Sequence, residues 1–159
     1  MAFSTKGRYG TMAMLDLAIH YGEGPILAKD IAKRQHISQR YLEHLLISLK
    51  LAGMVRSTRG THGGFSLAKP PSQIRLDEII RVTEGSMAPA ECVDNPEAYP
   101  RVAICAVYDV WSELKTAINS VLESINLQDL LERQRQKWDS NQSDERTANN
   151  REVQTCEKK

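Results

Sequence analysis

A helix is predicted for residues 38–50, because leucines recur there at the spacing of one helical face: Leu42, Leu45, Leu46 and Leu49. Ser38 stands where an N-cap is expected, with a hydroxyl for the free N–H groups of the first turn. Residues 28–34 are long enough for a preceding helix of two turns, and residues 35–37 connect the two helices. The pattern predicts a helix-turn-helix in which the second helix is the recognition helix.

Two short strands, residues 54–57 and 65–68, are predicted on either side of a glycine-rich tip, TRGTHGG. Glycine permits positive φ and a close approach of the backbone to a ligand. Arg59 beside Gly60 suits the narrow minor groove of DNA, where the negative potential is deepest. A leucine stripe alone is typical of a core, and a glycine-rich hairpin alone is typical of a turn. The succession of helix, helix and hairpin indicates a DNA-binding winged helix.

Two more helices complete this domain, which we place at residues 1–85. Residues 6–21 have an apolar face that should pack beneath the recognition helix, and residues 76–84 form a short helix that ends before Gly85. Lys6 and Arg8 lie at the start of the first helix, where cations oppose the macrodipole. We therefore expect these two side chains to contact phosphate.

A longer apolar stripe predicts one helix of about twenty residues in the second half of the chain. Its members are Val107, Val110, Trp111, Leu114, Ile118, Val121, Leu122 and Ile125. Because the first domain already has enough elements for its own core, this stripe is best buried against a second copy across a two-fold axis. Packing back onto its own domain is the alternative.

The predicted fold is mainly α with a small β wing: a winged helix-turn-helix domain plus a long dimerisation helix. Residues 86–101 contain three prolines and are expected to be an irregular, cysteine-bearing sensor loop. Residues 102–138 contain the dimerisation helix and a shorter C-terminal helix. Residues 139–159 have no aromatic residue and few aliphatic ones, so we expect a disordered tail there.

The distribution of charge points to a polyanionic partner. Residues 1–70 contain ten Lys or Arg and four Asp or Glu, a net charge of +6, whereas residues 71–159 contain eleven and sixteen, a net charge of −5. A basic domain joined to an acidic one fits nucleic-acid binding combined with protein association. In helix-turn-helix geometry, base edges face the first turns of the recognition helix, that is, Ser38, Gln39, Arg40, Glu43 and His44.

Other classes of protein find little support in the chain. The RGTHGG segment lacks the lysine and serine of a phosphate-binding P-loop, and no H-E-x-x-H motif occurs, so we do not expect an enzyme. There is no apolar run of transmembrane length and no signal core after the first residues, so we expect no membrane association and a cytoplasmic location. Three cysteines argue against a disulfide framework.

Four segments resemble the Rrf2 family of bacterial winged-helix regulators. They are STKGRYG at residues 4–10, ISQRYLEHLL at 37–46, STRGTHGGFSLAK at 57–69 and SINLQDL at 124–130. The resemblance covers about residues 1–137 and implies a homodimer, joined by the long helix, that represses or activates promoters at a partly palindromic operator. It places base-reading and wing positions on Ser38, Arg40, Glu43, His44 and Arg59. The full set of candidate DNA contacts is Lys6, Arg8, Ser38, Gln39, Arg40, Tyr41, Glu43, His44, Arg59, Gly60, Thr61 and His62.

The same resemblance raises the question of an iron–sulfur cluster. Some members of the family hold a cluster with three cysteines in the loop before the long helix. The matching loop here begins with Cys92 and ends with Cys105, while the middle cysteine position falls on Tyr99 and a histidine position falls on Tyr108. Two thiols leave a four-coordinate site short of ligands unless the second chain or a small thiol contributes. Cluster binding, thiol oxidation and a regulatory partner protein therefore remain open as the signal.

The expected function is that of a dimeric, sequence-specific transcriptional regulator, acting as a repressor on double-stranded operator DNA. It would sense iron–sulfur, redox or cysteine status through the segment from Cys92 to Cys105. The alternative is an interaction module that has lost DNA binding and dimerises through the long helix. Exposed cations at Arg40 and Arg59 would have no use in such a module.

Overall fold

The computed structural model describes the backbone of residues 4–156 and the side chains of residues 4–141. The first three helices form the predicted helix-turn-helix and the helix beneath it: α1 (Thr5–Ile19), α2 (Ala28–Gln35) and α3 (Gln39–Leu51). The turn between α2 and α3 begins at His36, whose φ of 52° is left-handed and reverses the chain after α2. The expected boundaries of these helices are confirmed to within a few residues.

The leucine stripe forms the core of the domain. Leu42, Leu46 and Leu49 are fully buried against the apolar faces of α1 and α2, together with Met14 and Ile31. The apolar face of α3 therefore points inward and its polar face outward, as the period of 3.6 residues requires. Burial of the leucine side chains fixes the rotation of the recognition helix, and so decides which of its residues can reach a ligand.

The wing is a two-stranded antiparallel sheet of β1 (Val55–Thr58) and β2 (Gly64–Leu67), with Val55 opposite Leu67 and Thr58 opposite Gly64. Ile26 pairs with Phe65 through two backbone hydrogen bonds of 2.8 Å and extends the base of the wing by one bridge. An added Cβ at Gly64, where φ is 150°, would collide with the backbone of Ile26. Glycine is therefore required at this crossing.

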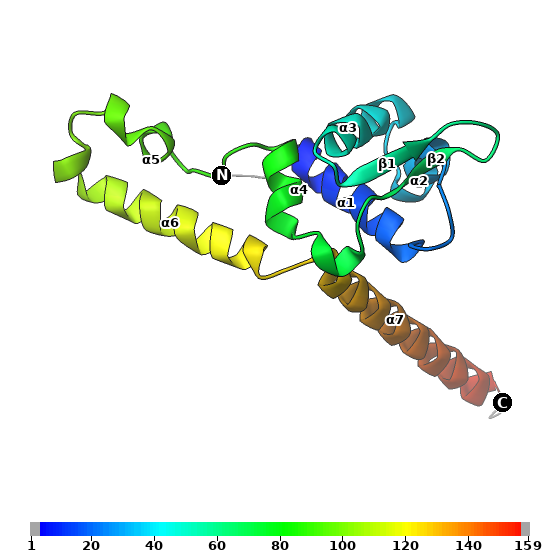
Figure 1. The fold of residues 1–159 in the computed structure, drawn as a ribbon. Helices are drawn as coiled ribbons and strands as arrows, with labels where there is room; N and C mark the ends of the chain where they lie inside the picture. The colour runs from blue at the N-terminus through cyan, green and yellow to red at the C-terminus, as the bar shows by residue number, and fades with distance from the viewer. Residues whose placement is uncertain (1–3, 157–159) are drawn as a thin grey trace.

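The chain after residue 85 forms two extensions: an arm, which comprises residues 86–123, and a stalk, which comprises residues 127–156. Helix α4 (Leu76–Thr83) closes the domain against α1, and the chain then passes through α5 (Glu91–Asp94) into α6 (Ala106–Glu123). Figure 1 shows α5 near the end of α6 that is far from the winged-helix domain, and α6 leading back to the domain; α7 (Leu127–Cys156) then leaves toward the opposite side. The arm and the stalk thus extend from the domain in different directions, while Leu127 at the start of α7 is buried in the domain core.

Two expectations for irregular structure need correction. The segment 86–101 contains the helical turn α5 and a 3-10 turn at Pro96–Ala98, and a second 3-10 turn follows at Val102–Ile104. Pro96 occupies the first position of its turn, where a missing N–H costs nothing. The structure also continues α7 to Cys156, so residues 139–156 are helical and not a disordered tail; residues 157–159 lie outside the described part. Residues 139–156 contain neither glycine nor proline, and their alanine, glutamate, arginine and glutamine residues favour helix without tertiary packing.

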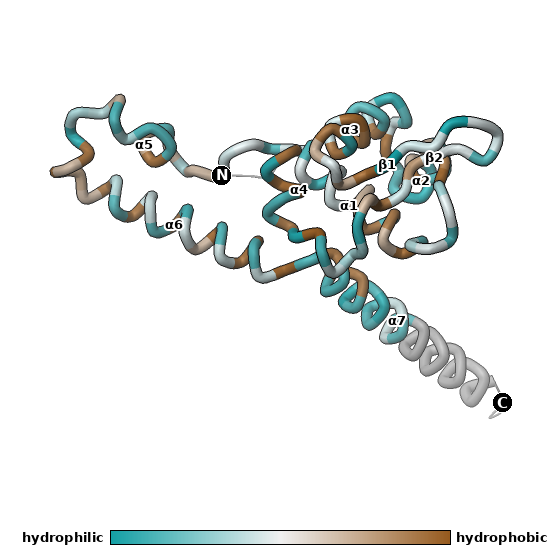
Figure 2. The backbone as a smooth tube through the Cα atoms, viewed as in Figure 1, coloured by the Kyte–Doolittle hydropathy of each residue, from teal (hydrophilic) through white to brown (hydrophobic). Residues whose placement is uncertain are grey.

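The hydropathy of the arm differs from that of the stalk. Figure 2 shows apolar positions recurring along α6, whereas the described part of α7 beyond its first turns is mostly hydrophilic. No helix in residues 4–156 is long and apolar enough to cross a membrane.

Candidate nucleic-acid interface

The outer face of α3 presents the predicted base-reading side chains. Gln39, Arg40 and His44 are exposed, and Glu43 is half-buried beside them. The amide of Gln39 donates a hydrogen bond of 2.8 Å to Glu43 Oε1, so these two side chains act as one polar unit. The guanidinium of Arg40 stands apart from that pair and offers donors that match guanine O6 and N7.

Ser38 precedes the first residue of α3, as the sequence predicts, but its side chain makes no capping hydrogen bond. The backbone carbonyl of Ser38 accepts the N–H of Leu42 at 2.9 Å, which begins the helical ladder. The exposed hydroxyl of Ser38 is therefore not committed to the helix end and is available to a ligand.

Tyr41 connects the recognition helix to the start of α1. Its hydroxyl oxygen lies 3.2 Å from Thr5 Oγ1, and its ring meets the ring of Tyr9 edge-on, with centroids 6.0 Å apart and planes at 81°. An edge-to-face pair of this kind adds about 0.5–1.5 kcal/mol beyond its buried area. The side chain of Tyr41, a candidate DNA contact, is thus held against the start of α1 by both its hydroxyl and its ring.

A carboxylate of the protein itself compensates the positive charge at the start of α1. Lys6 and Arg8 are exposed there, and the sequence alone suggested phosphate as the compensating anion. The structure instead places Glu84, the C-cap of α4, over this helix end: Glu84 Oε1 accepts hydrogen bonds of 2.8 Å from the Gly7 N–H and from Ser4 Oγ. A carboxylate at a helix N-terminus is favourable. The sequence gives no signal for this contact, because Glu84 is 77 residues from Gly7.

Arg8 is held by its neighbour. Its guanidinium carbon lies 4.7 Å from the centroid of the Tyr9 ring, and its Nη2 donates a hydrogen bond of 2.9 Å to the Tyr9 hydroxyl. Lys6 has no side-chain partner among the described residues. Lys6 is therefore the cation of α1 that is ready to meet a phosphate, and Arg8 would first have to leave its partner.

The wing tip extends from the domain beside α3. Lys50 Nζ donates a hydrogen bond of 2.5 Å to Ser57 Oγ and so fastens the recognition helix to strand β1. The tip residues Arg59, Gly60, Thr61 and His62 are all exposed, and Gly60 has a φ of 107°. The tip is thus a polar, basic loop that is tied to the recognition helix at its base.

A buried ion pair fixes α2 against α1. Asp16 is 1% exposed and accepts hydrogen bonds of 2.6 and 3.0 Å from the Arg34 guanidinium and one of 2.8 Å from Gln35 Nε2. The hydrogen bond with Asp16 raises the pKa of Arg34 above its already high ordinary value. His20 adds a ring nitrogen 3.7 Å from Asp16 Oδ1. This network anchors the first helix of the helix-turn-helix motif, and sequence reasoning missed it, although a single acid on the apolar helix α1 was its signal.

The two predicted metal-ligating cysteines lie at the two ends of one segment. Cys92 is on α5 and Cys105 is the residue before α6; both are half-buried free thiols. Tyr99, at the position of a third ligand, donates a hydrogen bond of 3.1 Å to Glu91, and this bond raises the pKa of Tyr99. In the part of the chain that the structure describes, no three His, Cys, Asp or Glu residues gather as a metal site.

The predicted dimer stripe lies mostly on the surface of the arm. Val107, Trp111 and Val121 are 57%, 37% and 59% exposed, and Val110 and Leu114 are exposed as well. Leu122 is buried against the chain's own domain, and Ile118 and Ile125 are half-buried. The stripe therefore divides: Leu122 joins the domain, and the exposed members form an apolar face that the described part of the chain leaves uncovered.

The fold, together with the polar outer face of α3 and the basic wing tip, defines a winged helix-turn-helix DNA-binding protein. Residues 3–133 match the Rrf2 family, described as iron-dependent transcriptional regulators. The chain is 40% identical over 131 residues to the protein rrf2 of Nitratidesulfovibrio vulgaris, a match that covers 82% of this chain and 87% of that one. The chain belongs to the Rrf2 family and is a DNA-binding transcriptional regulator, not an enzyme.

Solved structures agree with this assignment. The structure of CymR, the global cysteine regulator of Bacillus subtilis, is similar with a TM-score of 0.69 at 39% identity, over 83% of this chain and 97% of that one. IscR of T. potens is similar with a TM-score of 0.69 at 43% identity, over 83% and 87% of the two chains. Both are winged-helix regulators of this family, which confirms the predicted fold class.

Proposed function

We propose that the protein is a homodimeric repressor that binds a partly palindromic operator in the cytoplasm. The observation that carries this proposal is the geometry of the DNA-facing side: a recognition helix with buried leucines, an outward polar face, and a basic wing tip fastened to it through Lys50 and Ser57. Gln39, Arg40, Glu43 and His44 read bases in the major groove, assisted by Ser38. Arg59 enters the minor groove from the tip, where Gly60, Thr61 and His62 let the backbone approach. Lys6 and Arg8 contact phosphate.

The exposed apolar face of α6 supports the homodimer. Val107, Val110, Trp111 and Leu114 form one stripe at helical spacing, and apolar stripes of this length on a monomer mark interaction sites. A two-fold axis between two copies of α6 would bury both stripes at once. The same axis would set the distance between the two recognition helices, and half-sites on DNA are read at fixed helical intervals.

The signal enters, we propose, through the thiols of Cys92 and Cys105. The family description names iron, yet the residues of this segment do not fit a cluster: the segment supplies two cysteines, and the further ligand positions are occupied by Tyr99 and Tyr108. Operator binding is therefore controlled by oxidation of these thiols or by a partner protein that docks on the segment. The relative CymR, named as a cysteine regulator, supports a signal of this kind. Because Cys105 is adjacent to the first residue of α6, a change there acts directly on the arm.

Binding to DNA fragments from the protein's own genome tests the proposal. We expect binding to a discrete promoter fragment that exceeds binding to random DNA, and a loss of affinity by orders of magnitude between about 50 and 200 mM salt, since each neutralised phosphate releases counterions. Equal binding to promoter and random DNA at low salt would contradict the regulator and favour the interaction module.

Metal analysis tests the signal separately. After anaerobic purification we expect an iron-free protein that still binds its operator and responds to thiol oxidants, and that loses the response as Cys92→Ala or Cys105→Ala. Iron and sulfide at cluster stoichiometry, lost in both variants, would overturn the thiol proposal and leave operator binding intact.

A further inference from the structure

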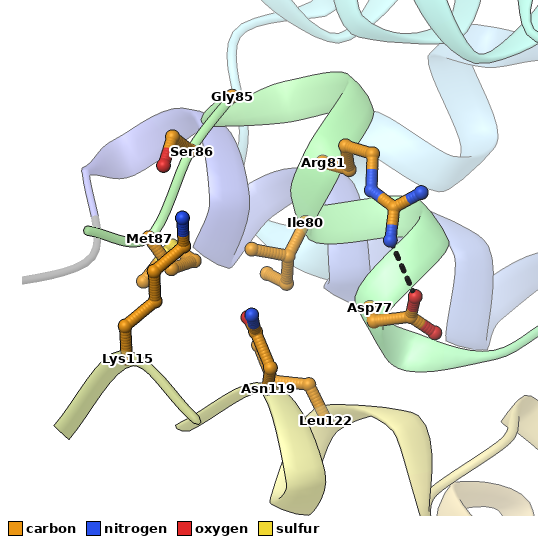
Figure 3. Close-up of a pocket in the computed structure, with 9 residues that line it drawn as sticks. All are labelled: Asp77, Ile80, Arg81, Gly85, Ser86, Met87, Lys115, Asn119 and Leu122. Carbon is orange, nitrogen blue, oxygen red and sulfur yellow. Dashed lines mark hydrogen bonds and ion pairs between the residues drawn. The ribbon is translucent and has the colours of Figure 1, made fainter. Parts of the chain in front are cut away.

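A cavity of about 340 Å³ lies between the DNA-binding domain and the arm, away from the recognition helix and the wing. Helix α4 forms one wall, α6 forms the opposite wall, and residues 85–87 close one end (Figure 3). Ligand sites in proteins begin at about 300 Å³, so this cavity has room for a small molecule.

The floor of the cavity is apolar. Ile80 of α4 and Leu122 of α6 are 4% and 8% exposed, and Met87 lies across from them. Figure 3 shows these side chains between the two helices, with the polar groups of Arg81, Lys115 and Asn119 around them. A ligand here would therefore place an apolar body on the floor and polar atoms at the rim.

The rim offers hydrogen-bond donors and a surplus of positive charge. Asp77 is the acidic residue of the lining, and both of its oxygens are taken: Oδ1 accepts from Arg75 at 2.8 Å, and Oδ2 accepts from Arg75 and Arg81 at 3.0 Å each. Arg81 uses one nitrogen in this contact and keeps others for a ligand. The side-chain amide of Asn119 points into the cavity and has no hydrogen-bond partner among the described residues.

Lys115 shows which chemical group suits this rim. Its Nζ donates a hydrogen bond of 2.7 Å to the carboxylate of Asp94, which belongs to α5 and not to the cavity lining. A carboxylate of the protein is thus already bonded to a lysine of the cavity lining. An incoming carboxylate would compete with Asp94 for the same ammonium group.

The cavity uses a different face of α6 from the dimer stripe. Lys115, Asn119 and Leu122 follow one another at i, i+4 and i+7, and this row is rotated by roughly a quarter turn from the row of Val107, Trp111 and Leu114. Leu122 lines the cavity and is also a member of the predicted dimer stripe. A homodimer formed through the stripe would accordingly leave the rim at Lys115 and Arg81 beside the interface and not within it.

We propose that this cavity binds a small organic anion, a carboxylate on a short apolar body, and that this binding regulates the arm. The carboxylate lies between Lys115, Arg81 and Asn119, and the apolar body lies on Ile80, Met87 and Leu122. Binding joins α4 to α6 more firmly and competes with Asp94 for Lys115. The competition releases the last residue of α5, two positions after Cys92. Helix α4 in turn contacts the start of α1 through Glu84, so the cavity communicates with the DNA-facing side.

Butyrate is the probe that tests the site on the full-length protein without DNA. The control is 1-butanol, which has the same four-carbon chain and no charge. In two-dimensional NMR spectra we expect saturable shifts of the Asn119 side-chain amide and of the Ile80 and Leu122 methyl groups with butyrate and not with 1-butanol. Lys115→Met should weaken butyrate binding by about tenfold, the value of a charge-assisted hydrogen bond. Lys137→Met, an exposed lysine on α7, should leave it unchanged.

Two further variants make the outcome decisive. Asp94→Asn removes the competing carboxylate and should strengthen butyrate binding, while Asn119→Leu should weaken it with the fold retained in the same spectra. The proposal is overturned by an absence of saturable shifts, by equal shifts with 1-butanol, or by equal losses in Lys115→Met and Lys137→Met. Because no DNA is present, these results stand apart from those of operator binding.

Discussion

Gly10 and Thr83 lie in such close contact that a Cβ added to Gly10 would fall 2.6 Å from the Thr83 methyl carbon. This contact joins the buried face of α1 to the last turn of α4, with the Thr83 hydroxyl already bonded to the Ile79 carbonyl at 2.9 Å. We predict that Gly10→Ala lowers the free energy of unfolding by about 1–3 kcal/mol, because overpacking outweighs the gain in helix propensity. Urea unfolding followed by circular dichroism measures it.

A second variant at this contact supplies the control. Thr83→Ser removes the methyl group and keeps the hydroxyl, so Gly10→Ala in the Thr83→Ser background should cost little or should stabilise the helix. An equal loss in both backgrounds would mean that the methyl group is not the obstacle.

The pair of Asp16 and Arg34 should be a main support of the helix-turn-helix. Arg34→Met leaves the buried carboxylate of Asp16 with Gln35 as its remaining strong donor, and we expect a loss of about 2 kcal/mol, less than for a fully buried pair because Arg34 is 38% exposed. Thermal unfolding measures the loss. Lys33→Met, on the exposed side of the same helix, should change stability within about 0.5 kcal/mol. Asp16→Asn should recover part of the loss in the Arg34→Met background, and no recovery would argue against an unpaired charge.

Base-reading and phosphate contacts should separate in binding measurements. Arg40→Ala and Glu43→Ala should each cost roughly 1–3 kcal/mol at the base that they read and should relax discrimination there. Lys6→Ala should weaken all sequences alike and reduce the salt slope by about one. Because Gln39 holds Glu43 by a hydrogen bond, Gln39→Ala should alter preference at the base read by Glu43 as well. Equal losses on operator and random DNA for all four variants would remove the assignment.

Arg59 at the wing tip should respond to the sequence that flanks the half-sites. We expect Arg59→Ala to weaken binding most on operators with A·T-rich flanks, where the minor groove is narrow and its potential most negative. Fluorescence anisotropy on operators that differ in the flanks alone measures this. Arg56→Ala, at an exposed position on strand β1, is the matched control and should show no flank dependence.

The arm should control the state of association. Trp111→Glu places a charge in the middle of the exposed apolar stripe, so we predict a monomer in analytical ultracentrifugation and a loss of cooperative operator binding. Thr116→Glu adds the same charge on the opposite face of α6 and should leave the dimer intact. A dimeric Trp111→Glu protein would place the interface elsewhere.

The sequence by itself determined the elements that depend on local patterns. The leucine spacing in α3, the glycines of the wing and the apolar stripe of α6 each have a period or a backbone requirement that neighbouring residues reveal. These patterns were sufficient for the winged helix and for the division of the second half into an arm and a C-terminal helix. They overstated irregular structure at residues 86–101 and 139–156, because the chemistry of proline and of polar residues is compatible with short turns and with an isolated helix.

The tertiary structure alone decided which distant side chains share a partner. Glu84 compensates the start of α1, Tyr41 turns its hydroxyl toward Thr5, and Asp16 is neutralised by Arg34. The cavity between α4 and α6 likewise arises from the packing of two helices far apart in sequence. Charge and hydrogen-bond complementarity have no period along a chain; they depend on distance in space, and only the packing of the helices sets that distance.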